Sequence, residues 1–241
     1  MMPLFGAGCA LFYGQTFETF ITPTPLVVDE YLVLGFLGGL EAWNGEDQGV
    51  RKLALQLRAK NLPGVHVETV EDRKRALALE LIRRAFDRNW DGLLDEQERR
   101  SARLILYGMS FGGAAVVKLA RQLQAMDVPV LLTVQVDSVG RDDAVIPANV
   151  AAAANLYQTD GMFIRGERTI RAEDPSKTAI LGNFHFTYEG KKIDLSAIPW
   201  YKLIFRVAHG KMNADPDVWA QVGKLIMDAI SRRGSGQPVI P

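Results

Sequence analysis

The segment Tyr107-Gly-Met-Ser-Phe-Gly-Gly-Ala-Ala115 contains the motif G-x-S-x-G, centred on Ser110. The apolar residues 103–107 before it predict a buried strand, and the alanine-rich residues 114–126 after it predict a helix. A serine between such elements stands on a tight turn, and a glycine two residues away on either side lets the two backbones approach closely. The pattern predicts a nucleophile elbow with Ser110 as the nucleophile. The alternative is a glycine-rich turn with an inert serine.

The rest of the chain alternates apolar runs with helix-periodic stretches, which is typical of parallel strands joined by crossover helices. Further strands are expected at residues 31–35, 65–70, 129–136 and 178–186. Further helices are expected at residues 49–60, 72–86, 96–102 and about 217–232. The sequence thus predicts an α/β fold, with a doubly wound, mostly parallel sheet and helices on both faces.

With the elbow in this setting, residues 26–233 resemble the α/β-hydrolase superfamily, which includes serine esterases, lipases and thioesterases. The resemblance implies that two backbone N–H groups hold an oxyanion, and the first is that of Phe111, next to the nucleophile. The second would come from the glycine-rich turn at residues 35–39, where Phe36 and Leu37 are both candidates. This turn lacks the His-Gly pair of many lipases, so the choice between them stays open, as does a turn that only caps a helix.

The chain offers three histidines as the general base. His66 and His185 lie in strand-like alternations, where a half-buried structural histidine is the commoner explanation. His209 follows the apolar residues 203–208 and precedes a polar loop and the final helix, which is where the resemblance places the catalytic histidine. A loop position would let its imidazole reach the elbow, so we expect His209 to take the proton from Ser110.

Two aspartates compete as the acid that orients this histidine. Asp137 ends the strand expected at 129–136, so its carboxylate emerges at the carboxyl edge of the sheet, where active sites of open α/β sheets form. The chain order Ser110, Asp137, His209 is that of α/β-hydrolases, although their acid more often follows the next strand. Asp194 has that commoner position, but it follows two lysines in a segment typical of an exposed turn. We expect Asp137 to be the acid, with Asp194 as its rival.

Residues 87–98 fit the twelve-residue loop of an EF-hand at every diagnostic position. The glycine at the sixth position permits the sharp turn, and oxygens at the other diagnostic positions can surround Ca²⁺. The expected ligands are Asp87, Asn89, Asp91, Leu93 through its carbonyl, Asp95 and Glu98. The pattern predicts a structural Ca²⁺ in an insertion at residues 72–102, although the partner that EF-hands usually have is missing. An acidic turn that binds nothing is the alternative.

Composition narrows the possible partners and compartments. Lys and Arg total 28, Asp and Glu total 28, and this neutral balance provides no basic field for nucleic acid. Cys9 is the only cysteine, which excludes an intramolecular disulfide. No stretch is apolar enough to predict a membrane span. We expect a cytoplasmic protein by default, with the cell envelope as an alternative because small residues surround Cys9 in the N-terminal segment 1–25. The tail 234–241 is expected to be loose.

Together these features predict a serine hydrolase that cleaves a small-molecule carboxylic ester or thioester through an acyl-enzyme on Ser110, without a cofactor in the chemistry. A non-catalytic, calcium-stabilised binding protein on the same scaffold is one alternative, and a peptidase or acyltransferase with the same triad is another. Residues 144–166 are expected to include loops that shape an acyl pocket. Its apolar candidates are Leu156, Tyr157, Met162 and Phe163, with a place in the core as the equal alternative for each of them.

Overall fold

The computed structural model describes residues 14–39, 41–161, 165–196, 198 and 207–234 of the chain. Cys9, Met162, Phe163 and most of the apolar segment before His209 lie outside the described residues. Within them, no helix is long and apolar enough to cross a membrane.

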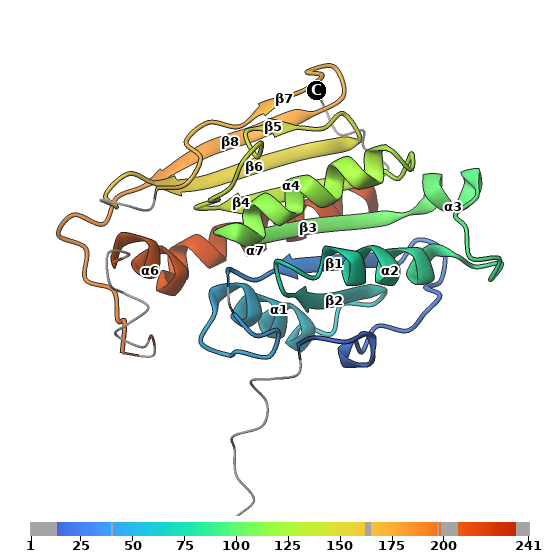
Figure 1. Cartoon of the computed structure of the whole chain (residues 1–241), viewed down its shortest axis with the longest axis horizontal. Coiled ribbons are helices and arrows are strands. Elements are labelled where there is room, and N and C mark those ends of the chain that lie inside the picture. Colours follow the sequence, from blue (N-terminus) through green and yellow to red (C-terminus); the bar gives the residue numbers. More distant parts are fainter. Residues whose placement is uncertain (1–13, 40, 162–164, 197, 199–206, 235–241) are drawn as a thin grey trace, which may run out of the picture.

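Six parallel strands form the central sheet, in the order β2-β1-β3-β4-β6-β8 (Figure 1). The strands are β1 (Tyr31–Phe36), β2 (Val65–Val70), β3 (Arg103–Met109), β4 (Val130–Val136), β6 (Val150–Gln158) and β8 (Ala179–Phe186). The chain builds outward from β1 to β2, and then returns to the other side of β1 with β3. The direction of winding therefore reverses between β1 and β3, and ligands of such sheets bind at the carboxyl ends of strands at this switch point.

Helices cover both faces of this sheet. Those named here are α1 (Gly49–Ala59), α2 (Arg75–Phe86), α4 (Phe111–Gln124) and α7 (Pro216–Gly234). Alternate residues of one strand point to opposite faces, so Leu32 and Leu34 of β1 belong to the core with α2 and α4, while Val33 belongs to the core with α1 and α7. Figure 1 shows α4 and α7 on opposite sides of the sheet. The predicted fold class, α/β with a doubly wound parallel sheet, is confirmed.

Most predicted elements match observed ones, and the main difference lies between β4 and β8. There, residues 144–166 were expected to include loops, whereas Val150–Gln158 forms the buried strand β6. Its run of four alanines lacks the β-branched and aromatic residues that mark a strand, and pairing with β4 and β8 on both sides determines its conformation. Leu156 is consequently a core residue with no exposed surface, rather than part of a pocket loop.

Smaller elements complete the described chain. The 3₁₀ helix η1 (Phe17–Thr19) lies in the N-terminal segment, and Gln15 just before it is buried against β2, where its amide donates to the carbonyl oxygen of Thr69 over 2.7 Å. The helix α3 (Glu96–Ser101) precedes β3, and β5 (Val145–Ile146) pairs with β7 (Arg171–Ala172) as a separate two-stranded ribbon. The described part of the N-terminal segment thus packs on the sheet.

Candidate active site

Ser110 stands between β3 and α4 with backbone angles φ 58° and ψ −127°. These angles lie outside the regions that L-residues favour, so the surrounding packing must hold them. A Cβ atom on Gly108 would lie 2.5 Å from the carbonyl oxygen of Gly112, and a Cβ atom on Gly112 would lie 2.1 Å from that of Phe36. Only glycine permits this approach of β1, β3 and α4, which explains the spacing of the motif around Ser110.

Two backbone hydrogen bonds tie this elbow to the end of β4. The Ser110 N–H donates to the carbonyl oxygen of Val136 over 3.0 Å, and the Val139 N–H donates to the carbonyl oxygen of Ser110 over 3.1 Å. Between these two partners lies Asp137, whose backbone turns through a positive φ of 41°. The turn that carries Asp137 is therefore anchored on the elbow itself.

The carboxylate of Asp137 is fully buried and has three hydrogen-bond partners. Oδ1 accepts from the N–H of Gly166 over 2.8 Å, and Oδ2 accepts from Nε2 of Gln158 over 3.0 Å. Oδ2 also lies 2.6 Å from Nδ1 of His209. A carboxylate without water needs such partners to offset its lost hydration, and here they also fix its direction toward the imidazole.

This contact determines which nitrogen of His209 carries a proton. A carboxylate accepts hydrogen bonds, so Nδ1 is assigned as the donor to Asp137. In the neutral ring, Nε2 is then the acceptor, which is the nitrogen that a general base needs. The imidazole is 12% exposed, so it is reachable from solvent while its partner is not.

His209 lies in a helix, α6 (Val207–Ala214), and not in the loop that the sequence predicted. The short polar segment contains Gly210 and has a weak helical pattern, and long-range contacts hold it in place. Nζ of Lys211 donates to the carbonyl oxygens of Tyr188 and Lys191 over 3.1 and 2.8 Å. These contacts fix the position of the helical turn that carries His209. The imidazole is therefore held by a helix, and not by a loop.

A buried carboxylate holds the segment between α6 and α7. Asp215 has no exposed surface and accepts from the Tyr188 hydroxyl over 3.0 Å and from Nζ of Lys191 over 2.8 Å. Burial, followed by the charge of Asp215, raises the pKa of Tyr188, and the hydrogen bond to Asp215 raises the pKa of Lys191. Tyr188 and Lys191, which precede α6, are thereby joined to Asp215, which follows it. His209 lies between these residues in the chain.

The rival acid and the other two histidines lie in different surroundings. Asp194 is exposed and accepts from the backbone N–H of Ser196 over 2.9 Å, and this hydrogen bond lowers the pKa of its carboxyl. His66 lies 3.2 Å from Glu30, measured from Nε2 to Oε2. His185 stacks on the ring of Tyr157, with ring centroids 4.9 Å apart. The structure brings only His209 and Asp137 together among the predicted bases and acids.

The predicted oxyanion donors are in unequal positions. Phe111 is the first residue of α4, so its N–H has no partner within that helix. The Leu37 N–H donates to the carbonyl oxygen of Val70 over 2.9 Å and is already used. Phe36 is the last residue of β1 and pairs with neighbours on both sides. An oxyanion would have to compete with a partner within the sheet at either residue, so the structure does not separate Phe36 from Leu37.

Beyond Leu37, the chain turns against the elbow. A Cβ atom on Gly39 would lie 2.6 Å from Cδ2 of Phe111, so this turn packs directly on the residue after the nucleophile. The Gly38 N–H donates to Oε2 of Glu41 over 2.8 Å. An N–H group that binds a carboxylate oxygen also suits an oxyanion, and Gly38 becomes a candidate second donor that the sequence analysis did not single out.

Gln158 and Gly166 were also missed. Both contact Asp137, but they lie 21 and 29 residues further along the chain. The signal that could have found Gln158 is its place at the end of β6, because the carboxyl ends of parallel strands meet at one edge. Since β6 was not expected as a strand, that signal was lost.

Apolar side chains border the candidate site. A hollow beside α6 is lined by Asp160, Tyr188, Glu189, Val207, Ala208 and Lys211. Val207 and Phe111 are each 51% exposed, which is high for large apolar residues. Neighbours of His209 and of Ser110 thus present apolar surface.

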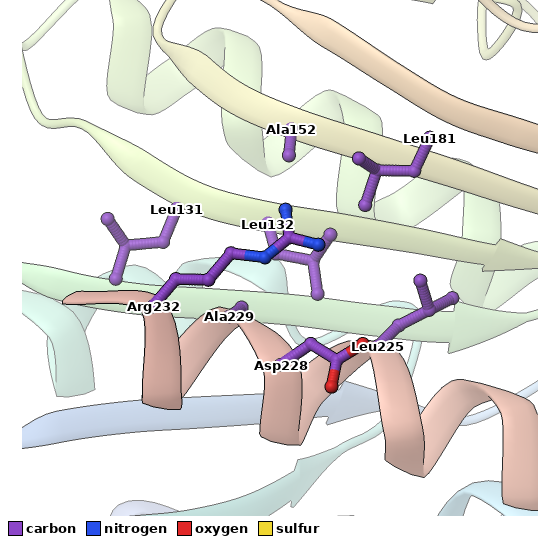
Figure 2. Close-up of a pocket in the computed structure, with 8 residues that line it drawn as sticks. All are labelled: Leu131, Leu132, Ala152, Leu181, Leu225, Asp228, Ala229 and Arg232. Carbon is purple, nitrogen blue, oxygen red and sulfur yellow. The ribbon is translucent and has the colours of Figure 1, made fainter. Parts of the chain in front are cut away.

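A second hollow lies between α7 and the sheet (Figure 2). It is lined by Leu131, Leu132, Ala152, Leu181, Leu225, Asp228, Ala229 and Arg232. Leu131 and Leu132 begin β4, whereas Asp137 follows its other end. This hollow is therefore separate from the elbow, and we do not include it in the candidate site.

The predicted calcium ligands lie far from these residues. The loop 87–98 connects α2 to β3 and contains the start of α3, and Figure 1 shows α3 and α6 at opposite ends of the sheet. Among the residues that the structure describes, no three His, Cys, Asp or Glu side chains form a group that could hold a metal ion. The predicted ligands are joined by hydrogen bonds but are not gathered around one point.

The fold of this chain is similar to folds among the solved structures, whereas its sequence matches less. No family model and no curated protein matches the sequence. A novel cutinase-like protein from Cryptococcus sp. is similar in structure, with a TM-score of 0.44 and 15% sequence identity over 86% of this chain and 98% of that chain.

Proposed function

We propose that this protein is a serine hydrolase that cleaves a carboxylic ester or a thioester through an acyl-enzyme on Ser110. The observation that carries the proposal is the contact of 2.6 Å between Nδ1 of His209 and Oδ2 of Asp137. It lies at the edge of the sheet where Ser110 adopts its strained elbow conformation. Strained backbone and a buried His-Asp pair that meet at one site are typical of a nucleophile, its base and the group that orients the base.

In the proposed reaction, Oγ of Ser110 attacks the carbonyl carbon of the substrate, and Nε2 of His209 takes the hydroxyl proton. The carbonyl oxygen becomes an oxyanion, which accepts hydrogen bonds from the N–H of Phe111 and from a second N–H, that of Phe36, Leu37 or Gly38. When the bond to the leaving group breaks, His209 returns the proton to the departing alcohol or thiol. Water then repeats the sequence and releases the acid, with Asp137 holding the imidazole throughout.

Labelling with a fluorophosphonate probe tests the proposal. We expect the native protein to react and to hydrolyse short acyl esters, and Ser110→Ala to lose both reactions while its thermal melt stays nearly unchanged. Ser176→Ala is the matched control, because Ser176 is exposed in a turn and should label as the native protein does. Labelling that survives in Ser110→Ala would refute the assignment of the nucleophile.

The remaining alternatives separate in the same experiment. A non-catalytic binding protein would give neither label nor turnover. A peptidase or acyltransferase would label at Ser110 but would prefer an amide substrate or an acceptor other than water. Acyl esters and thioesters of graded chain length then identify the substrate class, since apolar surface at Phe111 and Val207 favours an apolar acyl group.

A further inference from the structure

The loop 87–98 contains a buried carboxylate oxygen without a partner. Asp87 is 7% exposed, and its Oδ1 makes no hydrogen bond. Its other oxygen, Oδ2, accepts from the N–H of Gly92 over 2.9 Å, so the carboxylate is aimed into the loop. A buried polar atom without a partner costs free energy, and a charged one costs most. Among the described residues it is the only buried carboxylate oxygen without a hydrogen-bond partner, and a bound cation would offset this cost.

No basic side chain neutralises the acidic groups of this loop. Within the described part of the chain, Asp87, Asp91, Asp95 and Glu98 form no ion pair with Lys or Arg. The arginines nearby donate elsewhere: Arg83 donates to the carbonyl oxygen of Gly92, and Arg99 donates to that of Leu94. Four carboxylates on one loop are therefore left without a protein cation.

We propose that residues 87–98 bind one Ca²⁺ ion, with Asp87 as the buried ligand that begins the site. The remaining ligands are Asn89, Asp91, the carbonyl of Leu93, Asp95 and Glu98. A set of six oxygen-bearing residues suits Ca²⁺, which takes six to eight oxygens, better than Mg²⁺, which demands a near-ideal octahedron and keeps several waters.

The inferred binding includes one rearrangement. Oε1 of Glu98 accepts from the N–H groups of Arg88 and Asn89 over 2.7 and 3.2 Å, and Oε2 accepts from that of Asp95 over 3.0 Å. To become a bidentate ligand, Glu98 would turn both oxygens toward the ion, and the other ligands would gather around it, since no such group is formed in the described chain. The ion would thereby clamp the end of α2 to the start of α3.

The site includes the start of α3, which lies at the opposite end of the sheet from α6, the helix that carries His209, so its role is structural. The loop leads directly into β3, the strand that ends at Ser110. Binding of Ca²⁺ to the native state alone raises stability. At about a hundredfold excess of Ca²⁺ over its Kd, we expect the melting temperature of the full chain to rise by roughly 5–10 °C relative to the protein in EGTA.

Terbium gives a direct reading of occupancy. Trp90 is 71% exposed within the loop, and its indole can transfer excitation energy to bound Tb³⁺. We expect Tb³⁺ luminescence on excitation of tryptophan, its loss in Trp90→Phe, and its displacement by added Ca²⁺. Calorimetry with Ca²⁺ should still show binding to Trp90→Phe. None of these measurements uses ester hydrolysis, so they are independent of the proposed activity.

Two variants and a control complete the test. Glu98→Gln should lose most of the calcium-dependent shift, whereas Glu96→Gln should keep it, because Glu96 is exposed and pairs with Arg100. Asp87→Asn removes the unpartnered charge, so in EGTA it should melt at or above the native protein, and in Ca²⁺ below it. Equal melts of the native protein in Ca²⁺ and EGTA, with no heat of binding, would overturn the proposal.

Discussion

Nδ1 of His209 lies 2.6 Å from Oδ2 of Asp137, although 72 residues separate them in the chain. The contact joins the turn after β4 to the helix α6, and it is the only feature in which a predicted base meets a predicted acid within the described residues. The role of this contact in catalysis can be tested with a substitution that keeps the size of the side chain.

Asp137→Asn should lower kcat by several powers of ten. The side-chain amide of asparagine can donate a hydrogen bond to Nδ1, which would make Nδ1 the acceptor, place the ring proton on Nε2 and leave Ser110 without a base. Steady-state kinetics on a short acyl ester measure the effect. Asp194→Asn is the matched control, and we expect less than a threefold change because Asp194 is exposed and holds only a local turn. A reversed ranking would move the acid to Asp194.

Gly112→Ala should destabilise the elbow. Its Cβ atom would lie 2.1 Å from the carbonyl oxygen of Phe36, and backbone cannot move aside as a side chain can. We expect the free energy of unfolding to fall by about 1–3 kcal/mol, together with a lower kcat because the Phe111 amide shifts. Gly223→Ala in α7 is the control: its nearest neighbour is Cδ1 of Leu53 at 3.3 Å, and alanine favours a helix. Equal denaturation midpoints for the two variants would contradict the prediction.

The elements around Ser110 could be predicted because their patterns are local. A buried apolar strand, a glycine pair and an alanine-rich helix follow each other within residues 103–126, and the structure has β3 and α4 there. β6 could not be predicted in the same way, because its alanines gain a strand conformation only from β4 and β8 on either side.

The contacts of the candidate site are less predictable than its elements. Asp137 was singled out by its place after a strand, but its partners Gln158 and Gly166 come from distant segments. His209 was expected in a loop, since the anchors of α6 are the carbonyl oxygens of Tyr188 and Lys191, which no local pattern announces. Long-range hydrogen bonds decide these details.

Tyr188→Phe should weaken the contacts that hold α6 in place. The Tyr188 hydroxyl donates to Oδ2 of the fully buried Asp215, so the variant leaves that carboxylate with one donor fewer. We expect the free energy of unfolding to fall by about 1–3 kcal/mol. Because α6 carries His209, kcat should fall more than KM changes. Urea denaturation and steady-state kinetics measure the two effects, and an unchanged kcat would limit Tyr188 to a structural role.

The same network predicts a loss of stability in alkaline solution. In the folded chain, burial and Asp215 raise the pKa of Tyr188 above its ordinary value of 10.0, and the hydrogen bond to Asp215 raises the pKa of Lys191 above its ordinary value of 10.5. Both groups therefore hold their protons more tightly when folded than when unfolded. Their contribution to stability is complete below about pH 10 and is lost as the pH rises through the raised values.

Thermal melts between pH 8 and about pH 11 test this sign. We expect the melting temperature of the native protein to fall more steeply above about pH 10 than that of Tyr188→Phe, which has already lost one of the two titrating groups. Above about pH 10, the melting temperature of Lys191→Met should likewise fall less steeply than that of the native protein. At neutral pH it should be lower than that of the native protein, because Asp215 loses its cationic partner. Lys224→Met is the control, since Lys224 pairs with Asp228 on the exposed side of α7. The melting temperature of this variant should fall with rising pH as steeply as that of the native protein. If the native protein and Tyr188→Phe lost stability in parallel, the alkaline transition would belong to groups outside this network.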